Sequence, residues 1–146
     1  MNQAAPKKTT TTPPASGYSG TPLPKKLGIK DGTVLSLLNA PLGFRQLLGE
    51  LPRTIRVTSR MSKSTTLAIW FVKRRNVLGE HLPAISQSLI KGSIWVAWPK
   101  KASGVETDVT ESVVREAGLS VGLVDYKVCA IDSTWSGLLF TRRKSR

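Results

Sequence analysis

Apolar residues along this chain come in short, nearly continuous runs, separated by polar segments with helical spacing. Such runs are expected for strands covered on both faces of a sheet, and the chain has three of them, at 34–38, 67–72 and 94–98. The segment 54–58 instead alternates and is β-branched, as in an exposed edge strand. Two further segments, 123–131 and 135–141, are separated by a short polar turn and therefore predict an antiparallel hairpin.

Helix signals lie between the predicted strands. Pro41 stands where a first-turn proline is tolerated, so a helix is expected near 42–50. A second helical region is expected over 73–90. Pro83 interrupts this region, which predicts a kink or two short helices that meet near His81.

The third helix is expected to begin at Asp108 or Thr110, either of which can cap its first turn, and Gly118 is expected to end it. The order is then β-α-β-β-α-β-α-β-β, which predicts an α/β sandwich with a mostly parallel sheet of about six strands. The link 59–66 between the second and third strands would span about 26 Å when extended. A parallel crossing is therefore only just long enough, and a hairpin at this point is the alternative.

The chain is long enough for one domain, which we expect to cover 17–142. Residues 1–16 are rich in Thr, Pro and Ala, which predicts a disordered tail, and 143–146 form a basic C-terminal tail. Of the formal net charge of +13, residues 1–30 hold +5 and residues 142–146 hold +4, which leaves +4 for the body. Basic tails predict weak nucleic-acid contact, or alternatively only solubility, because no aromatic residues interleave the charges.

Cysteine count and hydropathy narrow the class of protein. Cys129 is the only cysteine, which excludes an internal disulfide and a cysteine metal cluster. No apolar run approaches the roughly 18 residues that a membrane helix needs, and the N-terminus lacks the apolar segment of a secretory signal. We therefore expect a cytoplasmic protein without a membrane partner, while the oligomeric state stays open.

Polar and aromatic residues follow several of the predicted strands. Ligands of open parallel sheets bind beyond the carboxyl ends of the strands, near the point where strand order reverses. The residues that could share this edge, here called the predicted rim, are Asn39, Lys73, Arg74, Arg75, Trp98, Lys100, Lys101, Ser103, Asp132 and Trp135. Lys and Arg would donate to an anionic or phosphorylated small molecule, with Trp as an apolar wall. The alternative is that the basic residues are solvated and the indoles are packed in the core.

No catalytic or metal-binding constellation is evident in the chain. The first strand is not followed by G-x-G-x-x-G, and G-x-x-x-x-G-K-[ST] is absent, so nucleotide phosphates have no dedicated glycine loop. His81 is the only histidine and is far in sequence from any plausible nucleophile, and Cys129 is typical of a buried, inert thiol. We therefore assign no catalytic residue, metal or cofactor. The leading interpretation is a non-catalytic module that binds an anionic partner.

Four segments resemble a family of short bacterial proteins that is known only as a domain of unknown function, number three-thousand-and-fifty-two in its series. They are Gly17-Tyr-Ser-Gly-Thr-Pro-Leu23, Lys26-Leu-Gly-Ile-Lys30, Ile94-Trp-Val-Ala-Trp-Pro-Lys100 and Asp132-Ser-Thr-Trp-Ser-Gly137. The resemblance covers most of the chain outside the tails. It implies no particular activity.

The predicted order of elements is also similar to the Rossmann-like sheet of S-adenosylmethionine-dependent methyltransferases, which ends in an antiparallel hairpin. This resemblance implies a three-layer Rossmann-like sandwich. In those enzymes a glycine-rich turn follows the first strand, and an acid at the end of the second strand binds the cofactor ribose. This chain has Asn39-Ala-Pro-Leu-Gly43 and Thr58-Ser-Arg60 at these places. Because Arg60 has the wrong charge for holding ribose hydroxyls, the resemblance implies a cut-down, cofactor-free relative, with a small active enzyme as the alternative.

Overall fold

A computed structural model describes residues 21–143 of the chain. The predicted tail at 1–16, and all but the first residue of the tail at 143–146, lie outside the described residues. The strands are β2 (Val34–Leu38), β3 (Arg56–Thr58), β4 (Leu67–Phe71), β5 (Ser93–Pro99), β6 (Leu123–Ala130) and β7 (Trp135–Arg142). The helices are α1 (Leu23–Leu27), α2 (Phe44–Leu48), α3 (Arg75–Ser88) and α4 (Glu111–Ser120), with a 3-10 turn η1 (Lys101–Ser103).

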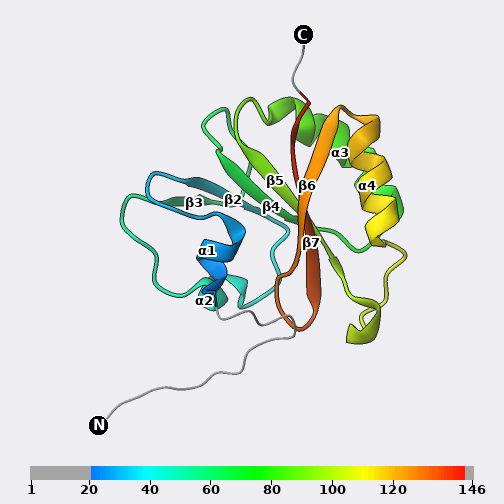
Figure 1. The fold of residues 1–146 in the computed structure, drawn as a ribbon, viewed down its shortest axis with the longest axis horizontal. Helices are drawn as coiled ribbons and strands as arrows, with labels where there is room; N and C mark the ends of the chain where they lie inside the picture. Colours follow the sequence, from blue (N-terminus) through cyan, green and yellow to red (C-terminus); the bar gives the residue numbers. More distant parts are fainter. Residues whose placement is uncertain (1–20, 144–146) are drawn as a thin grey trace.

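All six strands form one sheet in the order β3-β2-β4-β5-β7-β6 (Figure 1). Neighbours from β3 to β5 are parallel, and β7 is antiparallel to both β5 and β6. The mostly parallel six-stranded sheet with a closing antiparallel hairpin is therefore confirmed. The link 59–66 joins parallel strands that flank β2, so it is a parallel crossing and not a hairpin. Strand order reverses between β2 and β4, because the chain leaves β2 toward one side and returns on the other.

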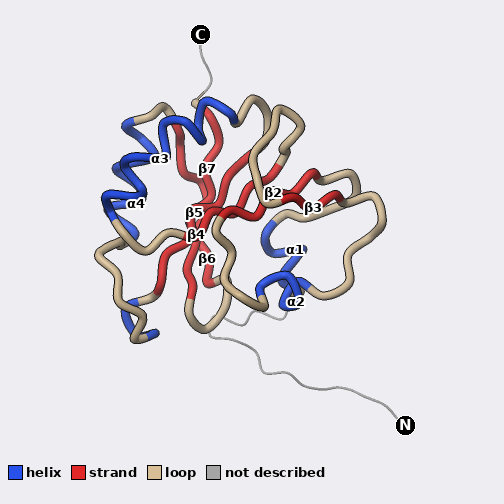
Figure 2. The backbone as a smooth tube through the Cα atoms, turned by 180° about the vertical axis from the view of Figure 1, so that it is seen from behind, coloured by secondary structure: helices blue, strands red, loops and turns tan. Residues whose placement is uncertain are grey.

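The helices cover the two faces of the sheet in pairs. Helices α1 and α2 lie on one face, and α3 and α4 lie on the other (Figures 1 and 2). Side chains of β4 alternate between the faces: Leu67, Ile69 and Phe71 pack toward α1 and α2, and the intervening Ala68 and Trp70 pack toward α3 and α4. This period of two explains why β4 is a continuous apolar run, since both faces are covered.

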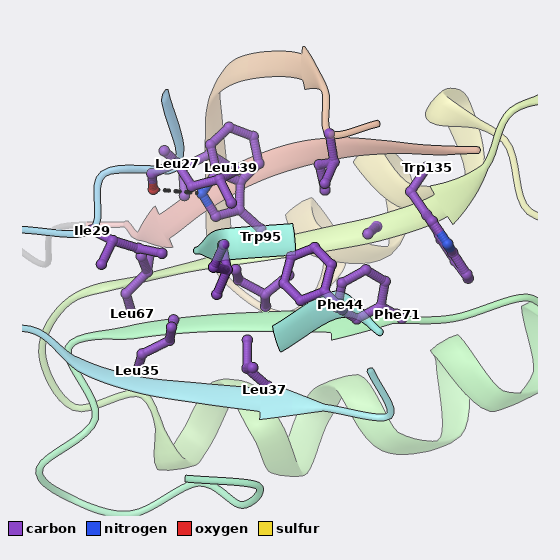
Figure 3. Packing of buried hydrophobic residues seen from close by; sticks show 14 residues of the cluster. Leu27, Ile29, Leu35, Leu37, Phe44, Leu67, Phe71, Trp95, Trp135 and Leu139 are labelled. Atoms are coloured by element: carbon purple, nitrogen blue, oxygen red, sulfur yellow. Dashed lines mark hydrogen bonds between the residues drawn. The ribbon is translucent and has the colours of Figure 1, made fainter. Parts of the chain in front are cut away.

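The core on the α1 and α2 face is built around Trp95, which is fully buried in β5 (Figure 3). Its indole Nε1 donates a 2.9 Å hydrogen bond to the carbonyl oxygen of Leu27 at the end of α1. Phe44 of α2 meets Phe71 edge-on, with ring centroids 4.8 Å apart. Contacts of aromatic side chains with the sheet therefore hold these two helices in place, although each helix is short.

Two of the predicted helix boundaries are wrong. Of the two alternatives predicted for Pro83, the two short helices are wrong: α3 is one helix, in which Pro83 is exposed while Leu78 and Leu82 pack inward. Gly118 does not end α4, which continues to Ser120. This glycine is buried where a Cβ atom would overlap the ring of Phe140, so its role is close packing against the sheet.

Candidate functional site

Part of the predicted rim is held together by the chain's own hydrogen bonds. Lys100 Nζ donates to the carbonyl oxygen of Asp132 at 2.7 Å, which joins the end of β5 to the hairpin turn. The carboxylate of Asp132 accepts from the backbone N–H groups of Thr134 and Trp135, both at 2.8 Å. Ser103 donates from its hydroxyl to the carbonyl oxygen of Lys100 at 2.7 Å. The structure thus brings Lys100, Ser103, Asp132 and Trp135 together, and these contacts order two adjacent turns.

The two tryptophans of the predicted rim are buried on opposite faces of the sheet. Trp135 belongs to the core next to α1 and α2 and meets Phe71 edge-on, with ring centroids 5.0 Å apart. Trp98 belongs to the core next to α3 and α4. They cannot form two walls of one ligand site. Both indoles are packed in the core, as the alternative interpretation of the sequence expects.

The basic residues Lys73, Arg74, Arg75 and Lys101 are exposed at the carboxyl edge of the sheet. The backbone N–H of Arg75 donates to the carboxylate of Asp108 at 2.8 Å, so Asp108 caps α3. Thr110 caps α4 by accepting from Val113 N, as one of the two alternatives predicted. Anion binding by these basic side chains stays a prediction.

Asn39 is the predicted rim residue that lies where strand order reverses. Its backbone has a φ of 57°, in the left-handed region that asparagine tolerates better than most residues. Its side-chain Nδ2 donates to the carbonyl oxygen of Phe71 at 2.9 Å and so links the carboxyl ends of β2 and β4. Asn39 also borders two hollows of the surface.

The first of these, here called the β2–β3 hollow, has a volume of about 670 Å³. It is lined by the loop after β2 (Asn39 and Ala40), by Arg45 of α2 and by residues 58–60 at the end of β3 and just beyond it, over an apolar floor of Leu37 and Val57. The adjoining strand ends can be followed in Figure 2. Its size is in the range of small-molecule sites, which is roughly 300–1,000 Å³.

The second, here called the α3 hollow, has a volume of about 520 Å³ on the opposite face. Its walls are mainly apolar and include Leu38, Met61, Trp70 and Ile85. His81 of α3 also borders it. The two hollows share Asn39, Ser59 and Arg60, so a ligand that crosses the strand ends would meet both.

The electrostatics of the β2–β3 hollow are set by Arg45 and Arg60, both of which are exposed. Among the described residues that line this hollow, none is acidic. Within the described part of the chain, neither guanidinium has a hydrogen bond or an ion pair; both salt bridges found there involve Arg115. Two guanidinium groups without a partner among the described residues therefore border one hollow.

The backbone of Arg60 is fixed by the hydroxyl groups of the buried Ser36 and the exposed Thr58. Its carbonyl oxygen accepts from Ser36 Oγ at 3.0 Å and from Thr58 Oγ1 at 2.9 Å. Ser36 is fully buried and also contacts Thr65 Oγ1 at 2.8 Å. Because Ser36 donates to Arg60, the proton of this last contact comes from Thr65. The crossing loop therefore leaves β3 along a defined path.

Sequence reasoning placed Asn39 on the predicted rim and Thr58, Ser59 and Arg60 after the second strand, but it did not name Arg45 as a lining residue. An exposed arginine on a short helix has no sequence signature that separates it from a solvated one. The position of Arg60 carried a signal, because it follows the second strand about 20 residues after the first, where Rossmann-like sites hold a charged ribose-binding residue.

Metal and thiol chemistry gain no support in the described part of the chain. It contains no group of three His, Cys, Asp or Glu residues that could hold a metal ion. Burial raises the pKa of the half-buried Cys129 thiol, while Lys26, Lys127 and Lys100 act in the opposite direction. No helix within residues 21–143 has the length and apolarity to cross a membrane.

Comparison with known proteins identifies the class of fold. No family model and no curated protein matches the sequence, so the numbered family of unknown function stays a prediction. A Sulfolobus solfataricus protein provisionally assigned as a type 11 methyltransferase matches at a TM-score of 0.53 and 12% identity, over 84% of this chain and 90% of that one. A protein in the NADB-Rossmann superfamily from Streptococcus agalactiae matches at a TM-score of 0.53 and 8% identity, over 90% and 72%. At these identities the likeness establishes the fold, which is Rossmann-like and of the methyltransferase type.

S-adenosylmethionine, the cofactor implied by the resemblance, fits the residues of this site poorly. The position for a ribose-binding acid is occupied by Ser59 and Arg60. The cofactor carries a sulfonium cation, and the β2–β3 hollow offers two guanidinium groups and no carboxylate. Like charges at short range are unfavourable. We therefore derive no methyl-transfer step for this chain.

Proposed function

We propose that this protein is a degenerate methyltransferase-like protein, which keeps the nucleoside-binding position of its fold and has lost the contacts for S-adenosylmethionine. The observation that carries the proposal is the β2–β3 hollow, which opens at the carboxyl ends of the strands beside the point where strand order reverses. Ligands of open α/β sheets bind at this place. The comparisons support a methyltransferase-type fold and lend no support to the broader interpretation of a module that binds anions along the whole rim.

Each of the two hollows suits a different part of a nucleoside. The α3 hollow is lined mainly by apolar side chains, among them the partly buried Met61, Val77 and Ile85, and suits the flat face of a base. The shared wall at Ser59 and Asn39 offers a hydroxyl and an amide to the ribose. The β2–β3 hollow, with Arg45 and Arg60, then binds the substituent that is attached to the ribose.

Calorimetric titration with adenosine, S-adenosylhomocysteine and S-adenosylmethionine at millimolar concentration tests this proposal. We expect heat of binding for adenosine and S-adenosylhomocysteine. S-adenosylmethionine should bind several-fold more weakly than S-adenosylhomocysteine, because its extra positive charge faces two arginines. No heat with any of the three would refute nucleoside binding. Tighter binding of S-adenosylmethionine would refute the loss of its contacts and favour the active enzyme.

A pair of variants localises the binding. Ala40 lines the β2–β3 hollow, and Ala102 is exposed on η1 at another part of the carboxyl edge. Ala40→Trp should fill the hollow and abolish the heat, while Ala102→Trp should leave it unchanged. Unchanged heat in Ala40→Trp, with its melting temperature intact, would place the ligand elsewhere.

A further inference from the structure

The guanidinium groups of Arg45 and Arg60 lie at the β2–β3 hollow and make no hydrogen bond or ion pair that would stabilise the described part of the chain. Arg45 projects from α2, and Arg60 follows β3, so two separate elements supply them. The carbonyl oxygen of Arg60 is fixed by Ser36 and Thr58, so the backbone that carries one of the two is held in place. Two arginines from different elements thus line one hollow beside the hydroxyl groups of Thr58 and Ser59, with no acid among its lining residues, which is the chemistry that binds a dianion.

The place of Arg60 decides which part of a nucleotide the anion belongs to. In Rossmann-like sites, the charged residue after the second strand meets the ribose: an acid accepts from its hydroxyls, and an arginine accommodates a phosphate attached there. In this chain the residue after the second strand is an arginine, Arg60.

We propose that the β2–β3 hollow selects a nucleotide whose ribose carries a phosphate ester on a ring hydroxyl, with the phosphate held by Arg45 and Arg60. This inference rests on the proposed nucleoside-binding function and names the class of ligand. The phosphate replaces the interaction that a carboxylate would otherwise make with the ribose. Such a site needs no glycine-rich phosphate loop, since side chains and not backbone amides bind the charge.

Titration of the full-length protein with a matched set of small ligands tests the proposal. The set is adenosine, 5′-AMP, 2′-AMP, 3′-AMP and inorganic phosphate. We expect 2′-AMP or 3′-AMP to bind at least tenfold more tightly than adenosine and than 5′-AMP, since a desolvated charge-assisted contact is worth roughly a factor of ten or more. Inorganic phosphate alone should bind more weakly than any of the nucleotides.

The outcomes separate the two proposals. Adenosine binding with no gain from a ring phosphate overturns the present inference and leaves nucleoside binding intact. A gain limited to 5′-AMP also overturns it, because the phosphate would then lie on the other side of the ribose. Equal affinity for inorganic phosphate and 2′-AMP, without adenosine binding, overturns both and leaves a simple anion site.

Substitutions at the two arginines give a second measurement. Arg60→Ala and Arg45→Ala should each lower affinity for the preferred phosphorylated nucleotide about tenfold, a much larger factor than any change in adenosine affinity. Arg60→Lys should restore part of the loss, because it keeps the charge but not the fork of donors. Arg74→Ala, an exposed arginine at the carboxyl edge outside both hollows, is the matched control and should have no effect.

Charge reversal gives the sharpest contrast. Arg60→Asp places a carboxylate where the resemblance implies one, so it should abolish the phosphate preference and make adenosine the better ligand. Because Arg60 is exposed and its side chain has no hydrogen bond within the described residues, this variant should keep the melting temperature of the parent. If it binds the phosphorylated nucleotide as tightly as the parent, the assignment of Arg60 is wrong.

Discussion

Ser36 shows how a single buried side chain shapes the site from a distance. Its hydroxyl lies in β2, does not line either hollow, and ties the carbonyl oxygen of Arg60 to the sheet. It also contacts Thr65, which accepts from the backbone N–H of Ser62. One hydroxyl therefore fixes both ends of the crossing between β3 and β4.

Ser36→Ala should lower the free energy of unfolding by about 1–2 kcal/mol, because it removes the contact of the buried Thr65 hydroxyl and one of the two donors to the carbonyl oxygen of Arg60. It should also weaken nucleotide binding through looser placement of Arg60. Urea denaturation and calorimetry measure the two effects. Ser112→Ala is the control: this exposed serine of α4 has no side-chain hydrogen bond within the described residues, and both quantities should stay unchanged. An equally stable Ser36→Ala protein would contradict the role of this network.

At the scale of elements, two helical glycines predict opposite responses to the same substitution. Gly118 in α4 is buried, and an added Cβ would overlap the ring of Phe140. Gly79 in α3 is exposed, and a Cβ added there would meet no other atom within 4 Å. Alanine is preferred to glycine in a helix by about 1 kcal/mol when the site has room.

Gly79→Ala should therefore stabilise the protein by up to about 1 kcal/mol, and Gly118→Ala should destabilise it by roughly 1–3 kcal/mol through overpacking. Thermal and urea denaturation of both variants checks the sign. If Gly118→Ala were as stable as the parent, α4 and β7 would be packed more loosely than this contact requires.

Elements differ in how far the sequence predicts them. The buried strands follow from apolar runs, and the hairpin follows from the short turn at 132–134, because burial and turn length are local signals. The end of α4 was not predictable, since Gly118 serves a contact with Phe140 that exists only in the folded sheet. Pro83 misled for a similar reason, because the exposed side of α3 accommodates it.

The candidate site was predictable in position and not in composition. The rule that ligands lie at the carboxyl ends of strands placed Asn39 correctly beside the reversal of strand order. The burial of Trp98 and Trp135 on opposite faces, and the part of Asp132 in the hairpin turn, depend on packing that the sequence does not encode locally. Arg45 enters the site only because α2 is fixed by Phe44 to the core.

At the scale of the whole molecule, charge is concentrated toward the ends of the chain. Residues 1–30 and 142–146 together hold +9 of the formal +13. The tails 1–16 and 143–146 hold +5 of this charge, and we expect any weak nucleic-acid binding to depend on them and to fall steeply with salt, through counterion release. Gel-shift assays of the full chain and of a variant lacking 1–16 and 143–146, across a salt series, measure this. Affinity that survives the deletion would show that the domain itself contacts nucleic acid.

The central claim is that a nucleoside ligand binds at the carboxyl ends of β2 and β3, and backbone amide chemical shifts test it residue by residue. Titration of the isotope-labelled protein with S-adenosylhomocysteine should shift the amides of Asn39, Arg45 and Arg60. The amides of η1 and of the turn at 132–134 should stay in place. Shifts confined to η1 and that turn, or no shifts at millimolar ligand, would contradict the account.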